Sequence, residues 1–130
     1  LFRARTQNMI KKRILIVEDE PLTAMEEQSI IENMGHEVCA IANSREEAVS
    51  LALTESPDLV LMDIRLTGEM DGIEAARRIR QIREVPVIFV TAQTGTMAES
   101  LTGEIRVSKP FSPDQLSGAV SRLLDEGCLC

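Results

Sequence analysis

Acidic side chains follow two of the most apolar stretches of the chain, where carboxylates can act together. Glu18 and Asp19 come directly after the run at residues 14–17, and Asp63 comes directly after a second run at residues 59–62. Carboxylates held close together repel one another unless a cation joins them, and a hard divalent ion such as Mg²⁺ suits their oxygens. These three residues predict a magnesium site, provided that the fold brings the two runs side by side.

Two further polar residues occupy equivalent places later in the chain. Thr91 follows the apolar run at residues 87–90, and Lys109 follows a weaker run at residues 105–107. Taken alone, none of these polar residues is strong evidence for a site. A lysine before a proline is often a turn residue, and an acid such as Asp19 is often part of a helix cap. It is their shared position, each just past an apolar run, that indicates a site in which Lys109 adds positive charge beside the carboxylates.

The apolar runs alternate with segments of helix length. Three runs are continuous rather than alternating, which is typical of strands covered on both faces of a parallel sheet, whereas residues 105–107 alternate as an edge strand would. Between the runs, apolar residues recur at helical spacing, as at Ala24, Ile30, Ile31 and Met34. We therefore predict an α/β fold, a flavodoxin-like doubly wound (βα)5 parallel sheet. In its strand order 2-1-3-4-5, the first and third strands are neighbours.

Helix boundaries agree with this pattern, with one exception. Ser44 with Glu47, and Ser112 with Gln115, are spaced as capping boxes. Residues 93–104 are rich in Thr and Ser and are bracketed by glycines, so we expect the fourth helix to be shortened.

Composition narrows the class of protein. The 130 residues suit one domain, and 44% hydrophobic and 27% charged residues are ordinary for a globular protein. The net charge of −7, with three Phe and neither Trp nor Tyr, argues against direct nucleic-acid binding. No apolar run approaches the ~20 residues that cross a membrane. The three cysteines fit reduced thiols, so we expect a cytoplasmic protein.

The motifs at the predicted strand ends, taken in order, resemble the receiver domain of bacterial two-component response regulators. They are ILIVEDEP at 14–21, LVLMDI at 59–64, MDG at 70–72, VTA at 90–92 and SKPF at 108–111. The resemblance covers nearly the whole chain. It predicts a receiver domain at residues 12–125, between a flexible extension at 1–11 and a short tail at 126–130.

This resemblance implies a function for the acidic residues. Asp63 matches the phosphoacceptor, which takes a phosphoryl group from a sensor histidine kinase or a phosphotransfer protein. Glu18 and Asp19 match the acidic pair that binds Mg²⁺, with Asp63 and the backbone carbonyl of Arg65 as further ligands. Such a domain is a signalling protein rather than an enzyme, although it assists its own phosphorylation and dephosphorylation.

The resemblance also implies how the signal would leave the site. Thr91 matches the switch hydroxyl that turns toward the phosphoryl group, and Lys109 matches the lysine that pairs with its oxygens. Pro110 matches a proline usually preceded by a cis peptide bond. The conformational change would then be recognised by a downstream protein.

Three features depart from the common pattern of the family. The loop before Gly72 is slightly longer and has Thr67-Gly68 where a proline is typical, and the span before Lys109 is a few residues shorter than usual. Arg106 stands where the family commonly has an aromatic residue that moves with the switch threonine. The shape of the loop and the length of the fourth helix depend on the first two departures. The usual coupling of Thr91 to position 106, and output through the fourth and fifth elements, depend on the third.

Other protein classes fit these residues less well than a receiver domain. Residues 63–67 partly resemble the nucleophile motif of haloacid-dehalogenase-type phosphatases, but Arg65 stands where that motif has its second aspartate. Neither glycine-rich nucleotide-binding motif occurs. A pseudo-receiver that binds partners without phosphorylation is a third reading, which the complete acidic site disfavours. Met9 as a natural start favours a stand-alone regulator over a module of a hybrid kinase. The sequence leaves open whether the chain forms a homodimer.

Overall fold

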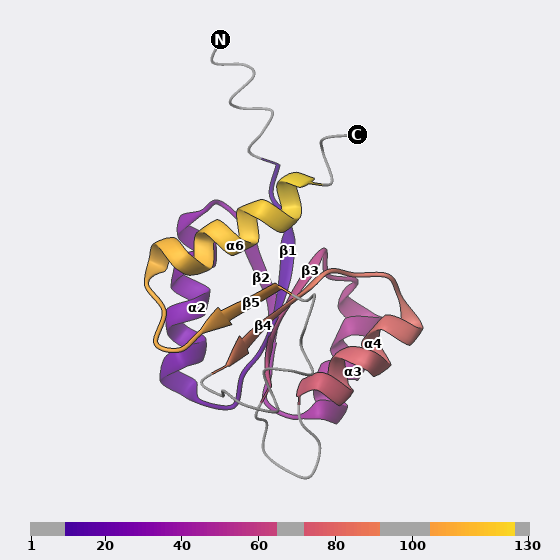
Figure 1. Ribbon diagram of the computed structural model, residues 1–130. Helices are drawn as coiled ribbons and strands as arrows, with labels where there is room; N and C mark the ends of the chain where they lie inside the picture. The colour runs from indigo at the N-terminus through magenta and orange to yellow at the C-terminus, as the bar shows by residue number, and fades with distance from the viewer. Residues whose placement is uncertain (1–9, 65–71, 92–104, 127–130) are drawn as a thin grey trace.

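The computed structural model describes residues 10–64, 72–91 and 105–126. These residues form one five-stranded parallel sheet in the order β2-β1-β3-β4-β5 (Figure 1). The strands are β1 (Arg13–Val17), β2 (Glu37–Ala42), β3 (Leu59–Asp63), β4 (Val87–Thr91) and β5 (Ile105–Ser108). The predicted α/β class and strand order are therefore confirmed.

The three continuous apolar runs are the inner strands of the sheet. Every residue of β3 and β4 is buried, as are the last four residues of β1, whereas β5 lies at the edge and alternates in exposure. In the register of the sheet, Val17 lies opposite Met62, and Asp63 lies opposite Val90. The carboxyl ends of these strands are therefore level with one another, at the edge where the candidate residues follow.

Four helices of the described residues cover the two faces of the sheet (Figure 1). Helices α2 (Pro21–Asn33) and α6 (Pro113–Glu126) pack on one face, and α3 (Arg45–Glu55) and α4 (Gly72–Ile82) pack on the other. Each face of the sheet has its own hydrophobic core, and alternate residues of β1 pack in the two cores. Ile14 and Ile16 face α2 and α6, whereas Leu15 and Val17 face α3 and α4. This alternation explains why the inner strands have to be apolar throughout.

Side-chain caps begin the helices at the predicted places. The backbone N–H of Glu47 donates to Ser44 Oγ at 3.2 Å, and that of Asn43 donates to Glu47 Oε1 at 2.9 Å. Before α6, Ser112 and Gln115 exchange reciprocal hydrogen bonds of 2.8 and 3.1 Å between side chain and backbone. Both capping boxes thus supply acceptors for N–H groups that a helix start leaves unpaired, although Glu47 bonds one residue earlier than the standard pattern.

Several predictions fall on parts of the chain outside the described residues. These are the shortened fourth helix at residues 93–104, the loop that contains Thr67-Gly68, most of the N-terminal extension and nearly all of the C-terminal tail. Among the described helices, none combines the length and the apolar character that crossing a membrane requires. Cys39 is a half-buried free thiol, and burial raises its pKa, in keeping with a structural residue.

Candidate functional site

Four strands each bring one polar residue to the carboxyl edge of the sheet. Glu18 follows β1, Asp63 ends β3, Thr91 ends β4 and Lys109 follows β5. Burial is nearly complete for three of them, since Glu18, Asp63 and Thr91 are only 2%, 5% and 4% exposed. Polar groups are costly to bury without partners, so this grouping at one edge marks a functional site rather than a solvated loop.

Lys109 joins the two buried carboxylates. Its Nζ atom lies 3.2 Å from Glu18 Oε1 and 3.2 Å from Asp63 Oδ2. The position is fixed through the backbone as well, because the Lys109 N–H donates to the Thr91 carbonyl at 2.8 Å and the Lys109-Pro110 peptide bond is cis. The cis bond implied by the family resemblance is confirmed. The lysine thus neutralises part of the charge of this site at the point where β1 and β3 meet.

The three acidic residues lie close enough to share one cation. Glu18, Asp19 and Asp63 each offer a carboxylate oxygen, and these oxygens lie within 4.8 Å of one another. Oxygens that bind one Mg²⁺ at ~2.1 Å lie at most about 4.2 Å apart, so small side-chain movements bring this set into range. The donor set, all oxygen and rich in negative charge, fits Mg²⁺ better than a softer metal. The carbonyl of Arg65, the further ligand that we expected, lies outside the described residues.

Burial and crowding perturb the protonation of the site. Burial raises the pKa of Glu18 to about 7, and the neighbouring Asp63 adds to the rise while Lys109 opposes it. For Lys109, burial lowers the pKa, but the carboxylates of Asp63 and Glu18 outweigh that effect and leave it above the ordinary value. Lys109 is therefore firmly cationic, and the cluster has more negative charge than one lysine can neutralise.

Two further residues near the site bear on how it works. Arg106 is exposed on the edge strand β5, where its Cα pairs in register with Phe89, so no aromatic side chain occupies that place. Glu27 was missed altogether: it lies on the buried face of α2 and is 1% exposed. Its position between Ala24 and Ile31, one turn from each on the apolar stripe, was the signal that could have revealed it.

Comparison with known proteins agrees with the geometry of the site. The family model described as the response regulator receiver domain matches residues 14–121. The chain is 40% identical over 117 residues to the phyllosphere-induced regulator PhyR of Methylorubrum extorquens, covering 85% of this chain and 43% of PhyR. It is 39% identical over 115 residues to the transcriptional regulatory protein PdtaR of Mycobacterium tuberculosis, covering 85% of this chain and 56% of PdtaR. The chain thus spans about half the length of these relatives.

Solved structures give the same result. The crystal structure of the response regulator PhyR from Brucella abortus superposes with a TM-score of 0.81 at 36% identity, over 98% of this chain and 55% of that one. The solution structure of the PhyR receiver (REC) domain from Erythrobacter litoralis gives a TM-score of 0.81 at 34% identity, over 91% of this chain and 93% of that domain. The chain therefore belongs to the response regulator receiver domains of two-component systems, and among them it is similar to the receiver of PhyR.

Proposed function

We propose that this domain accepts a phosphoryl group on Asp63 in a Mg²⁺-dependent reaction, with a sensor histidine kinase or a phosphotransfer protein as donor. The observation that carries the proposal is the position of the Asp63 carboxylate. It is buried at the end of β3, held by Lys109 at 3.2 Å and grouped with Glu18 and Asp19 within 4.8 Å. The proposal applies equally to a stand-alone regulator and to a module of a longer protein.

The chemistry requires positioning more than proton transfer. A carboxylate oxygen of Asp63 attacks phosphorus, a new O–P bond forms, and the P–N bond to the histidine of the donor breaks with its electron pair leaving on the imidazole. Carboxylates are ordinarily ionised at neutral pH, so the nucleophile needs no general base. The rigid end of β3 therefore contributes chiefly by aligning the attacking oxygen.

Neutralisation of charge is the second requirement. The phosphoryl oxygens are negative, and they arrive at a site that already contains three carboxylates. Mg²⁺ bound by Glu18, Asp19 and Asp63 would supply the positive charge that phosphoryl transfer needs. Lys109 Nζ, which bridges Glu18 and Asp63, can pair with a phosphoryl oxygen after a small movement.

The bound phosphoryl group would then change the surroundings of the site. A carboxylate with one negative charge becomes an acyl phosphate with roughly two, so the end of β3 gains about one negative charge and several acceptor oxygens. Thr91 ends the neighbouring strand β4 and supplies a hydroxyl donor, and its carbonyl is bonded to the Lys109 N–H. A movement of either residue is therefore coupled to the other, and we propose that a downstream protein recognises the resulting change.

Intact-mass analysis after incubation with acetyl phosphate tests the proposal. The wild type should gain the mass of one phosphoryl group with Mg²⁺ and none with excess EDTA, and Asp63→Asn should gain none. Asp58→Asn is the matched control, because Asp58 is exposed directly before β3 and accepts a bond from the Arg13 N–H that an asparagine oxygen can keep. An unmodified wild type, even with a phosphorylated kinase as donor, would instead favour a pseudo-receiver that binds partners without phosphorylation.

A further inference from the structure

Glu27 is a buried carboxyl that the proposed reaction does not use. It lies in the middle of α2 with 1% of its surface exposed, and its Oε1 atom has no hydrogen-bond partner among the described residues. Burying a carboxyl in this way costs stability, and an apolar residue at this position would avoid the cost. Departures of this kind from ordinary packing concentrate at functional sites.

The charged groups around Glu27 are those of the phosphorylation site. Glu18 from the end of β1, Asp63 from the end of β3 and Glu26 from its own helix raise its pKa, and Lys109 lowers it. Burial is the largest cause, and together these effects raise the pKa of Glu27 to about 8. Glu27 is thus mainly protonated at neutral pH and ionises in mildly alkaline solution.

Open space lies between Lys109 and α2. A cavity of about 290 Å³ is lined by Lys109, Pro110 and Phe111 on one side and by Thr23 and Glu26 of α2 on the other. Thr23 is one helical turn before Glu27, and Glu26 precedes it directly. The lysine side chain therefore has room to turn from the carboxylates of the site toward the helix that carries Glu27.

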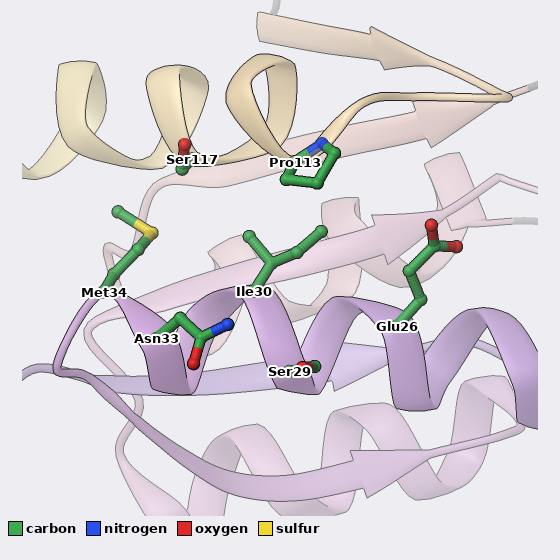
Figure 2. Close-up of a pocket in the computed structure, with 7 residues that line it drawn as sticks. All are labelled: Glu26, Ser29, Ile30, Asn33, Met34, Pro113 and Ser117. Carbon is green, nitrogen blue, oxygen red and sulfur yellow. The ribbon is translucent and has the colours of Figure 1, made fainter.

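A second hollow lies along the same side of α2. A second cavity of about 450 Å³ separates α2 from the start of α6, and Figure 2 shows its lining residues from Met34 at one end to Glu26 at the other. Glu26 lines both cavities.

We propose that Glu27 is a positioning residue that controls Lys109 through its charge. Protonated Glu27 leaves the lysine on Asp63 and Glu18, where it can neutralise an incoming phosphoryl group. Ionised Glu27 draws the ammonium group toward α2 and adds a negative charge behind the site, so phosphoryl transfer slows. This inference rests on the proposed function, because it concerns the rate of that reaction.

The rate of phosphorylation by acetyl phosphate, measured by intact mass at saturating Mg²⁺ between pH 6.5 and 9.5, tests the inference. The variant Glu27→Gln keeps the shape of the protonated carboxyl but does not ionise. The rate of Glu27→Gln divided by that of the wild type should be close to one at pH 6.5 and should rise to about five- to tenfold at pH 9.5. Titration of other groups largely cancels in this ratio. Glu32→Gln, at an exposed position further along the same helix and outside both cavities, should give a constant ratio.

A second measurement tests whether the Glu27 carboxyl is protonated in the folded protein. The pKa of Glu27 is raised in the folded state, so its contribution to stability is fully present below the unfolded value near 4.3 and is lost as pH rises through about 8. In urea unfolding, the wild type should therefore lose stability relative to Glu27→Gln between pH 5 and 9. Parallel stability curves would overturn the inference.

The outcomes separate the inference from the function on which it rests. A wild type that is phosphorylated at pH 6.5 supports the proposed function whatever the ratio does. A ratio that stays flat from pH 6.5 to 9.5, or a Glu27→Gln variant that is slower by the same factor throughout, would overturn only the role of Glu27. A wild type that forms no adduct at any pH would overturn both.

Discussion

Lys109 is the residue on which the charge balance of the site depends. Its ammonium group lies between the carboxylates of Glu18 and Asp63, whose side chains are 0% and 7% exposed. In such surroundings a cation stabilises the folded protein chiefly by preventing the two carboxylates from facing each other unpaired. Mg²⁺ bound by the same carboxylates would have the same effect, so the two cations should partly substitute for one another.

Replacement of Lys109 by methionine tests whether Mg²⁺ can take over the role of the lysine. Without Mg²⁺ at pH 8, we expect the free energy of unfolding to fall by about 1–3 kcal/mol, because two buried carboxylates lose their common partner. Mg²⁺ should then stabilise Lys109→Met more than it stabilises the wild type, since the ion meets a more negative cluster. Urea unfolding with and without Mg²⁺ measures both effects.

The control for this variant is Lys11→Met, which removes the same charge from an exposed position before β1. Its stability and its response to Mg²⁺ should match those of the wild type. Equal stabilisation of all three proteins by Mg²⁺ would show that Lys109 and the ion do not act on the same carboxylates.

At the scale of elements, the start of α4 lies directly against the end of β3. The Gly72 N–H donates to the Ile64 carbonyl. A Cβ atom at Gly72 would lie 2.8 Å from the carbonyl carbon of Asp63 and 2.8 Å from the Cα of Ile64. Real Cβ atoms do not approach backbone so closely, so only glycine lets α4 begin next to Asp63 and Ile64.

Gly72→Ala should therefore displace the backbone that carries Asp63. We expect the free energy of unfolding to fall by roughly 1–3 kcal/mol, as overpacking of a close contact typically costs. Phosphorylation by acetyl phosphate should slow as well, because the attacking oxygen moves out of alignment. Urea unfolding and the initial rate of adduct formation measure the two effects.

Gly118 provides the matched control, because it lies in α6 with no heavy atom within 4 Å of an added Cβ. Gly118→Ala should raise the free energy of unfolding by about 0.5–1 kcal/mol, the helix propensity gained from alanine. If Gly72→Ala proved as stable and as reactive as Gly118→Ala, the close contact between α4 and β3 would not matter for the site.

The elements also show what could be predicted from the sequence. Continuous apolar runs predicted the buried strands, because a strand covered on both faces has no position for a polar residue. Capping pairs such as Ser44 with Glu47 predicted helix starts, because those contacts are local in sequence. The site residues Glu18, Asp63, Thr91 and Lys109 followed from the positions of the strand ends.

What could not be predicted depends on contacts between distant parts of the chain. The bridge from Lys109 to both carboxylates requires the rotamer of a long side chain, which no spacing determines. Glu27 interrupts an apolar helical stripe, and its burial depends on the helices and strands that pack around α2. A local pattern therefore predicted which polar residues gather at this edge of the sheet, but not the buried carboxyl of Glu27 behind them.

For the whole molecule, the residues that stabilise the fold and the polar residues of the candidate site occupy different parts of the sheet. Both faces are covered by helices, and the apolar cores lie there, while the polar residues of four strands gather at one edge. Phe111, which follows the cis Lys109-Pro110 bond, packs with the core beneath α2 and α6. Lys109 is thus tied, two residues along the chain, to the packing of the face that α2 and α6 cover.

In the proposed reaction, a carboxylate oxygen of Asp63 forms the new bond to phosphorus. The residue that carries the phosphoryl group can be identified by chemical trapping. Hydroxylamine attacks an acyl phosphate, releases inorganic phosphate and leaves a hydroxamate on the residue that was phosphorylated. After treatment with acetyl phosphate and Mg²⁺, followed by hydroxylamine and peptide mapping by tandem mass spectrometry, the hydroxamate should lie at Asp63. A hydroxamate at Glu18 or Asp19, or none in a protein that had gained the phosphoryl mass, would contradict this account.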